Sequence, residues 1–335
     1  MNSRERIFAR INGEKSDRIP NLNILMQFAA REIGVTYSQY TQDYKLLAKG
    51  NIVCAQKYGI DCVTTMSDPM REAGDRGTEV VFPPDDVPYP KVDLIKDPQD
   101  LLKLKIIQPC DSKRMGDSVR TIEQYKKEVG GELAIIGWVE GCFAEAADLR
   151  GVNHFLLDLC DDGSFTKDLL DLCLEQAIVY ARAQIEAGAD IIGVGDAIAS
   201  VAGPHMYRDL ALGYEIKILK AIKDMGAKTK LHICGNITPF LADIPSEYVD
   251  ILDVDWMVPL DEAIRLHGDK ICISGNYDPV SVLLQGSTAD IDKAVRDCAA
   301  IGTQKYVSSA GCETPKFTPQ ENLMQVHKTL IEMQG

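Results

Sequence analysis

The chain has 335 residues, 45% of them hydrophobic and 26% charged, and its 36 basic and 50 acidic residues give a formal net charge of −14. This length and composition are typical of a globular protein with a full hydrophobic core. The excess of acid argues against a general nucleic-acid-binding protein and against one that binds anionic membranes. No apolar run approaches membrane length and Met1–Glu14 lacks the pattern of a signal peptide, so we expect a cytoplasmic protein whose ten cysteines are reduced.

Short β-rich runs alternate along the chain with longer segments of helical spacing, after a polar helix predicted within residues 1–20. The expected strands are Asn21–Leu25, Asp61–Met66, Leu133–Val139, Asp190–Gly195, Lys230–Cys234, Asp250–Asp255, Lys270–Ser274 and Lys305–Ser309. The expected helices between and after them include Leu169–Ala187, Met206–Met225, Leu260–His267, Ala289–Ile301 and Pro319–Met333. Strands that are apolar on both faces and separated by helices pair in parallel, and eight such units predict a (β/α)8 barrel, residues 1–335 forming one domain. A doubly wound open sheet is the alternative.

The segment 69–109 breaks this alternation because it is rich in proline and has little helical spacing. We interpret it as an elaborated loop after the second expected strand, containing a hairpin. In a barrel such a loop lies over the catalytic face, where it could act as a lid.

A possible metal site follows from two strand ends. His232 and Cys234 are two residues apart at the end of one expected strand, so both side chains project to the same face. Cys312, at the end of the last expected strand, could complete a His/Cys/Cys set. Thiolates with imidazole favour zinc, and three protein ligands leave the open fourth position of a catalytic site. Ordinary packing of these residues in the core or a loop is the competing interpretation.

Three carboxylates lie at neighbouring strand ends. Asp68, Glu140 and Asp196 are candidate catalytic residues, either as a fourth zinc ligand that substrate displaces or as a proton acceptor. The alternative is that each caps a helix or binds a loop. The sequence contains neither a phosphate-binding glycine loop nor a cobalamin-binding Asp-x-His-x-x-Gly pattern, so a corrinoid would have to be carried by a partner protein.

Several short motifs carry a family resemblance. They are Arg18-Ile19-Pro20, Asp255-Trp256 with Val258, Gly275-Asn276-Tyr277-Asp278-Pro279, and Gly311-Cys312 followed by Pro319. The chain resembles the uroporphyrinogen decarboxylase superfamily over essentially its whole length, which implies a distorted (β/α)8 barrel. Within that superfamily, Leu231–Asn236 together with Gly311-Cys312 is similar to the zinc-binding motif of methylcobamide:coenzyme M methyltransferases and their bacterial relatives. The resemblance therefore implies zinc bound by His232, Cys234 and Cys312.

The departures from the decarboxylase pattern separate the two branches of the superfamily. The arginine-rich motif that holds the carboxylates of a porphyrinogen is reduced to Met26–Arg31, in which Arg31 alone is retained. The decarboxylase tyrosine falls near Asp148 and the late histidine falls at Cys312, whereas Asp68 does match the decarboxylase aspartate. We therefore expect methyl transfer rather than decarboxylation.

The reaction implied by the resemblance moves a methyl group between a methyl-corrinoid on a separate protein and a thiol or similar small molecule. Zinc would take the acceptor sulfur as its fourth ligand, with Glu140 or Asp68 in that position beforehand. Asn236 and Asn276 are expected either to orient ligands or substrate by hydrogen bonds or to serve as turn residues.

Three other functions stay open at this point. They are transfer in the opposite direction from a methyl donor such as a methyl ether, decarboxylation, and a non-catalytic barrel with a structural zinc. The sequence names neither the methyl acceptor nor the oligomeric state, which could be that of a homo-oligomer.

Overall fold

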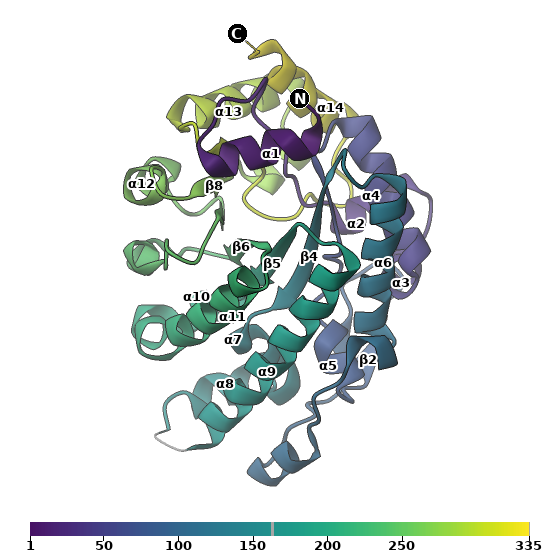
Figure 1. The fold of residues 1–335 in the computed structure, drawn as a ribbon, viewed down its shortest axis with the longest axis vertical. Helices are drawn as coiled ribbons and strands as arrows, with labels where there is room; N and C mark the ends of the chain where they lie inside the picture. Colours follow the sequence, from purple (N-terminus) through teal and green to yellow (C-terminus); the bar gives the residue numbers. More distant parts are fainter. Residues whose placement is uncertain (162–163, 335) are drawn as a thin grey trace.

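The structure is a computed structural model that describes residues 1–161 and 164–334. Seven parallel strands form its central sheet (Figure 1). Their order is β1-β4-β5-β6-β7-β8-β9, so each strand pairs with the next one along the chain in this series. The strands are β1 (Cys62–Thr64), β4 (Ala134–Glu140), β5 (Ile191–Gly195), β6 (Lys228–Ile233), β7 (Ile251–Val254), β8 (Cys272–Ser274) and β9 (Tyr306–Val307). They coincide with the second to eighth expected strands, and the expected parallel α/β architecture is confirmed.

The first expected strand, Asn21–Leu25, is instead an extended segment with a single parallel bridge between Asn21 and Ser308. The segment nevertheless joins the two edges of the sheet. On one side the Leu22 N–H donates to Ser308 O at 2.8 Å, and on the other the Asp61 N–H donates to Asn21 O at 2.9 Å. No regular ladder forms because side chains take part in the pairing: the amide oxygen of Asn23 accepts from the Ala310 N–H at 2.9 Å. This segment therefore completes the curled sheet in place of an eighth strand.

Helices surround the sheet, as the crossover connections of parallel strands require (Figure 1). They are α1 (Ser3–Asn12), α2 (Met26–Glu32), α3 (Tyr37–Gln42), α4 (Tyr44–Tyr58), α5 (Arg71–Asp75), α6 (Arg114–Glu128), α7 (Cys142–Arg150), α8 (Val152–Asp158), α9 (Ser164–Ala187), α10 (Ala197–Met206), α11 (Leu212–Asp224), α12 (Leu260–His267), α13 (Thr288–Ile301) and α14 (Gln320–Glu332). The expected helix 206–225 is divided, because a π-helical turn at Tyr207–Ala211 precedes α11. A second π-helical segment, Pro279–Leu284, follows β8, and a 3-10 helix, Thr238–Asp243, follows β6.

The polar helix predicted within residues 1–20 is α1, and it packs across the amino-terminal ends of the strands. Arg4 Nη2 lies 2.9 Å from Asp190 Oδ1, just before β5. Arg6 Nη1 lies 2.7 Å from Asp61 Oδ1, just before β1. The basic residues of this helix therefore close the end of the barrel opposite the strand ends that carry the candidate site. Both chain termini lie at this end (Figure 1).

The elaborated loop expected at 69–109 is confirmed. It contains α5, a two-stranded antiparallel hairpin of β2 (Val80–Val81) and β3 (Tyr89–Pro90), and a 3-10 helix at Pro98–Lys103, followed by a further 3-10 turn at Pro109–Asp111. Pro69, its first residue, lies on the wall of the cavity described below. Its action as a lid stays a prediction.

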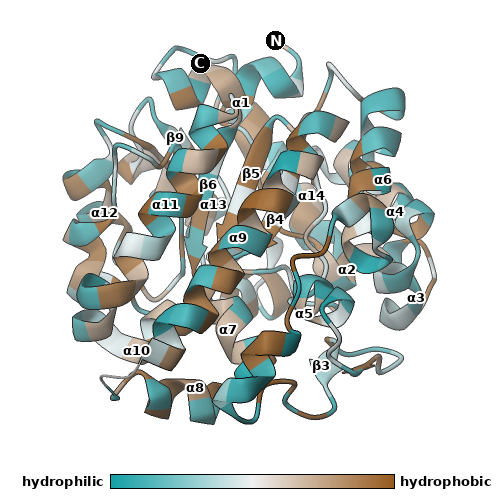
Figure 2. Cartoon of the chain, turned by 60° about the horizontal axis from the view of Figure 1, so that its bottom comes forward, coloured by the Kyte–Doolittle hydropathy of each residue, from teal (hydrophilic) through white to brown (hydrophobic). Residues whose placement is uncertain are grey.

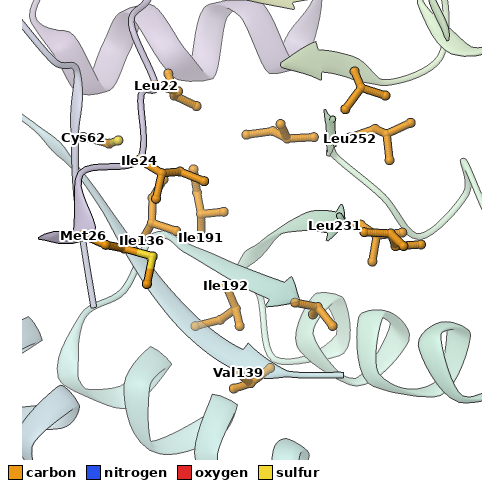
Figure 3. Close-up of a cluster of buried hydrophobic side chains, with 14 of the residues drawn as sticks. Leu22, Ile24, Met26, Cys62, Ile136, Val139, Ile191, Ile192, Leu231 and Leu252 are labelled. Carbon is orange, nitrogen blue, oxygen red and sulfur yellow. The ribbon is translucent and has the colours of Figure 1, made fainter. Parts of the chain in front are cut away.

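A continuous hydrophobic core fills the space inside the sheet and between the sheet and its helices. Ile24 of the closing segment lies against Ile136 and Ile191, while Val139 and Ile192 point to the other side of the strands (Figure 3). Figure 2 shows hydrophobic residues concentrated on the central strands and mixed hydrophilic and hydrophobic faces on the outer helices. Among the described residues, no helix is long and apolar enough to cross a membrane.

Candidate metal and active site

His232 lies near the carboxyl end of strand β6, and the alternation of side chains along the strand directs it to the interior. Lys230 and His232 point to the interior of the barrel, while Leu231 and Ile233 are fully buried against the helices. Cys234 follows on the interior side at the point where the strand ends, as the spacing of the two residues predicts. His232 is 2% exposed, and its Nε2 atom lies 2.9 Å from Cys234 Sγ.

Cys312 reaches the same place through close contacts among three loops. The Gly311 N–H donates to Tyr277 O at 2.9 Å, beyond the end of β8. A Cβ atom at position 311 would lie 2.1 Å from the Trp256 main-chain nitrogen, so only glycine allows this approach. The ligand atoms of His232, Cys234 and Cys312 lie within 4.8 Å of one another. The structure therefore brings together the three residues predicted as metal ligands.

Hydrogen bonds and charges within this set shift the pKa values of all three side chains. The hydrogen bond from Cys234, helped by His232, lowers the pKa of Cys312 to about 4 even though burial opposes the shift. The pKa of Cys234 is raised in turn by its hydrogen bond to Cys312 and by burial. For His232, burial opposes charging but the nearby Cys234 sulfur and Asp253 outweigh it and raise the pKa well above the ordinary value. A thiolate next to an imidazolium is an arrangement whose protons a soft cation can replace.

The donor set fits zinc. Two sulfurs and one imidazole nitrogen are typical zinc ligands, and three protein ligands leave one coordination position for a substrate. All ten cysteines lie in the described part of the chain and are free thiols, so neither Cys234 nor Cys312 is held in a disulfide. The carboxylates of Asp68 and Glu140 do not join the three-residue group, although both line the adjacent cavity.

Two charged residues that the sequence analysis did not single out support His232 from behind. Its Nδ1 atom lies 3.1 Å from the main-chain oxygen of Asp253 and 3.3 Å from the Asp253 carboxylate. Lys230 Nζ lies 2.7 Å from that carboxylate, and both residues are 2% exposed. This arrangement directs Nε2 toward the two sulfurs, as the carboxylates behind metal-binding histidines do. The buried lysine of β6 was the signal in the sequence, because it requires a buried acid nearby.

A cavity of about 150 Å³ lies beside this group of three side chains and is lined by two of them. Its walls include His232, Cys234 and the indole ring of Trp138. The ring fits because β5 carries glycines beside it: a Cβ atom at Gly193 or Gly195 would come within 2.5 Å of the indole. The Gly193-Val194-Gly195 sequence therefore makes room for an aromatic side chain.

Glu140 lines this cavity as a buried acid. Its Oε1 atom accepts a hydrogen bond from Trp138 Nε1 at 3.1 Å, and its main-chain N–H donates to Glu72 Oε1 at 2.9 Å. Burial raises the pKa of Glu140 well above its ordinary value, and the nearby Glu72 and Asp148 carboxylates add to the shift. Burial likewise raises the pKa of Glu72 to about 7. Glu140 is therefore a neutral acid that can donate a proton rather than a ready proton acceptor.

Asp68 also lines the cavity, but its charge is compensated. Arg114 Nη2 donates to its Oδ1 atom, and Ser67 Oγ donates to Oδ2 at 2.6 Å. Burial alone would raise the pKa of Asp68, but the guanidinium groups of Arg114 and Arg71 outweigh burial and lower it. The ion pair keeps this carboxylate ionised.

Asp196 lies away from the cavity wall and binds a helix end. Its carboxylate accepts from the Ala144 N–H at 2.9 Å and from the Phe143 N–H at 3.4 Å, in the first turn of α7. Burial raises the pKa of Asp196 to about 7, against the effect of these two hydrogen bonds. This geometry matches the capping role considered for Asp196 rather than a catalytic one.

The two asparagines stabilise loops around the site. Asn236 is exposed and its side-chain oxygen accepts from the Thr238 N–H at 3.0 Å, as in an Asx turn. Asn276 is buried, and its Nδ2 atom donates to Asp255 O at 3.0 Å and to Val258 O at 2.6 Å. Asp255 in turn accepts from the Gly235 N–H at 2.9 Å. Asn276 and Asp255 therefore connect the loops after β6, β7 and β8, and thereby support Cys234.

The chain is similar to known proteins over its length. Residues 2–333 match the family described as uroporphyrinogen decarboxylase (URO-D). The methylcobamide:CoM methyltransferase MtbA of Methanosarcina mazei is 32% identical over 234 residues, which are 69% of this chain and 68% of that protein. A uroporphyrinogen decarboxylase of Trichodesmium erythraeum is 30% identical over 69% of this chain and 66% of its own length.

A solved structure described as a methyltransferase from Methanosarcina mazei superimposes with a TM-score of 0.90, covers 99% of both chains and shares 23% sequence identity. This likeness establishes the fold along the whole chain. Together with the family match, it confirms the resemblance expected from the sequence: the chain belongs to the uroporphyrinogen decarboxylase family.

Proposed function

We propose that this protein is a corrinoid-dependent methyltransferase with a zinc ion held by His232, Cys234 and Cys312. It transfers a methyl group between a corrinoid on a separate protein and a small thiol. The observation that carries the proposal is the convergence of these three side chains within 4.8 Å beside a cavity at the carboxyl ends of the strands. The similarity to relatives named methylcobamide:CoM methyltransferases also supports the proposal.

The chain's own residues supply position and environment. Bound zinc would supply a Lewis acid that lowers the pKa of a coordinated thiol, so that a thiolate is available at neutral pH. His232 is oriented by Asp253, and the apolar wall around Trp138 keeps water away from the transferred methyl group. In the transfer, a sulfur–carbon bond forms as the cobalt–carbon bond breaks, and the electron pair of the broken bond stays on cobalt. Since reduced cobalt is the leaving group, the transfer to a thiol needs no general acid.

Two of the alternatives are less well supported by the site. No arginine or lysine belongs to the described cavity wall, although a decarboxylase needs cations for the several carboxylates of its substrate. Arg31, the one arginine retained from that motif, donates instead to the main-chain oxygens of Lys316 and Thr318. A structural zinc would require a fourth protein ligand, and among the described residues the group has three.

The proposal is tested by methyl transfer from free methylcobalamin. The protein is purified anaerobically, reconstituted with zinc, and mixed with methylcobalamin and 2-mercaptoethanol. We expect loss of the methylcobalamin absorbance and formation of the methyl thioether, detected by mass spectrometry. Cys234→Ala should abolish the reaction, whereas Cys110→Ser, which changes an exposed thiol elsewhere, should preserve it. Equal activity of Cys234→Ala and wild type would overturn the proposal.

A further inference from the structure

The cavity beside the ligand set has a wall made mainly of uncharged side chains. Met26, Met66, Pro69, Trp138 and Ala197 contribute its apolar part. Two methionines and an indole provide a flexible and polarisable surface, which suits small apolar groups. The polar side chains of the wall are those of the ligands His232 and Cys234 and of the two acids Asp68 and Glu140.

Neither acid leaves a free charge in the cavity. The charge of Asp68 is compensated by Arg114, whose Nη2 atom donates to it, and the Asp68 side chain is fully buried. Glu140 has its Oε1 atom bound to Trp138 Nε1 and is 9% exposed, and its burial favours the neutral acid. A divalent cation bound by two thiolates would also carry no net charge. The cavity is therefore close to electrically neutral.

Three cations pair with acids in or behind this site, and other protein groups also hold two of them. Arg114 Nη1 donates to Thr41 O at 2.7 Å. Arg71 Nη1 donates to Arg114 O at 2.7 Å, and its Nη2 donates to Ser67 Oγ at 2.8 Å. Lys230 Nζ is paired with Asp253 at 2.7 Å, below His232 in the barrel. None of these three residues belongs to the described cavity wall, so a buried anionic group would find no side-chain counter-charge there.

We propose that the small molecule that exchanges a methyl group in this cavity is uncharged, and that its analogue with a sulfonate or carboxylate group is rejected. This inference rests on the proposed methyltransferase function: it restricts the thiol to neutral thiols and, for transfer in the opposite direction, restricts the methyl donor to neutral methyl ethers. The physical reason is the cost of moving an anion from water into an apolar cavity without a partner. The choice between a thiol and an ether sets the direction of transfer and is decided by the arms of the test.

Binding can be measured without turnover because the chain has only two tryptophans, Trp138 in the cavity and Trp256 on a loop with 46% of its surface exposed. In zinc-loaded Trp256→Phe protein, the remaining fluorescence reports on the cavity. We would titrate two matched pairs: 2-mercaptoethanol against 2-mercaptoethanesulfonate, and methoxybenzene against 4-methoxybenzoate. We expect the neutral member of at least one pair to bind at least tenfold more tightly than its anionic partner. Binding of the thiol pair indicates a methyl acceptor, and binding of the ether pair indicates a methyl donor.

A charge placed in the wall should invert this preference. Met66→Lys adds an ammonium group on a side chain of similar length, and Met66→Leu is the matched apolar control. We expect Met66→Lys to bind the anionic member at least tenfold more tightly than Met66→Leu does, with thermal unfolding and zinc content confirming that both variants are folded and loaded.

The outcomes separate this inference from the proposed function. Equal or tighter binding of the anions to the Trp256→Phe protein would overturn the inference and leave the methyltransferase proposal intact. Selective binding of neutral compounds without any methyl transfer to or from cobalamin would support the inference on ligand charge and overturn the proposed function. Failure of all four compounds to change the fluorescence would overturn the inference, because the cavity would not accept a small neutral molecule.

Discussion

At the amino-terminal ends of the strands, buried acids are matched by arginines, whereas at the carboxyl-terminal ends several buried acids lack a full partner. Asp61, with 0% exposure, accepts hydrogen bonds from Arg6, from Arg18 and from the Asn21 N–H, at distances of 2.7 to 2.8 Å. Beyond the carboxyl end of β4, Glu145 has one contact with Arg76 at 3.3 Å, and its Oε2 atom has no hydrogen-bond partner among the described residues.

This difference separates structural from functional use of charge. Complete pairing at the amino-terminal end fixes α1 and the closing segment 21–25 to the strands and occupies both carboxylate oxygens of Asp61. Incomplete pairing at the other end costs stability but leaves acids and thiols that can exchange protons. In barrel enzymes generally, residues at the amino-terminal ends of the strands contribute to stability and residues at the carboxyl-terminal ends carry the chemistry.

The largest effect is expected from loss of a metal ligand. In Cys312→Ala one of the three donors is missing, and we expect zinc affinity to fall by more than about a thousandfold, well beyond the effect of changing a residue behind a ligand. Metal analysis of anaerobically purified protein should give about one zinc per chain for wild type and almost none for the variant. Cys298→Ala, on α13, is the control and should keep its zinc. Unchanged zinc content in Cys312→Ala would mean that the metal lies elsewhere.

The next effect concerns the opposite end of the barrel. Asp61→Ala removes the acid that Arg6 and Arg18 share, and we expect the free energy of unfolding to fall by about 3–5 kcal/mol, because the buried guanidinium of Arg18 loses its carboxylate partner and that of Arg6 keeps Asp17 alone. Chemical denaturation measures the change. Zinc binding of the folded variant should remain that of wild type, since the two ends do not share residues. A large loss of zinc affinity without loss of stability would contradict this separation.

A smaller effect is expected from the residue that supports His232. Asp253→Asn weakens the interaction behind the imidazole, and we expect zinc affinity to fall about tenfold to a hundredfold. Because the change also leaves Lys230 without its ion pair, the Lys230→Met/Asp253→Asn double variant serves as the control. If the loss comes from orientation of His232, a chelator competition assay will show weakened binding in both proteins. Recovery of full affinity in the double variant would show instead that the unpaired lysine causes the loss.

The sequence was sufficient for the fold and for the convergence of His232, Cys234 and Cys312, for physical reasons. Buried parallel strands alternate with helices, and strand spacing places His232 and Cys234 on one face, so both could be predicted from local pattern. The closing segment was misassigned as a strand because its apolar residues look like one, although its pairing with Ala310 uses the Asn23 side chain.

The roles of the acids could not be read from the sequence, because they depend on partners far along the chain. Asp68 and Glu140 both follow strands and line one cavity, but Arg114 keeps the first ionised while burial beside Glu72 keeps the second neutral. The capping role of Asp196 likewise depends on α7, which is 52 residues away at the contact with Ala144. Trp138 was also missed as part of the cavity wall, although the glycines of β5 were a signal that a large side chain lies against that strand.

The smallest expected effect is the contribution of one buried acid at the carboxyl end, Glu145, to the pH dependence of stability. Burial raises the pKa of Glu145 to about 8, although Arg76 opposes the shift. Between the ordinary glutamate value and about 8, the folded state binds more protons at this group than the unfolded state does, so the free energy of unfolding falls as pH rises through that range and then levels off. Glu145→Gln should make this decline shallower, by at most about 1.4 kcal/mol per pH unit. Glu175→Gln, on the exposed face of α9, should leave the profile unchanged. Denaturation curves between pH 5.5 and 8.5 give the free energy of unfolding at each pH, and the slopes of its pH dependence are compared between the proteins. A loss of stability in Glu145→Gln that is the same at every pH therefore does not affect the test. Identical slopes in Glu145→Gln and wild type would show that Glu145 is ionised in the folded protein, and that Arg76 satisfies it as fully as Arg6 and Arg18 satisfy Asp61.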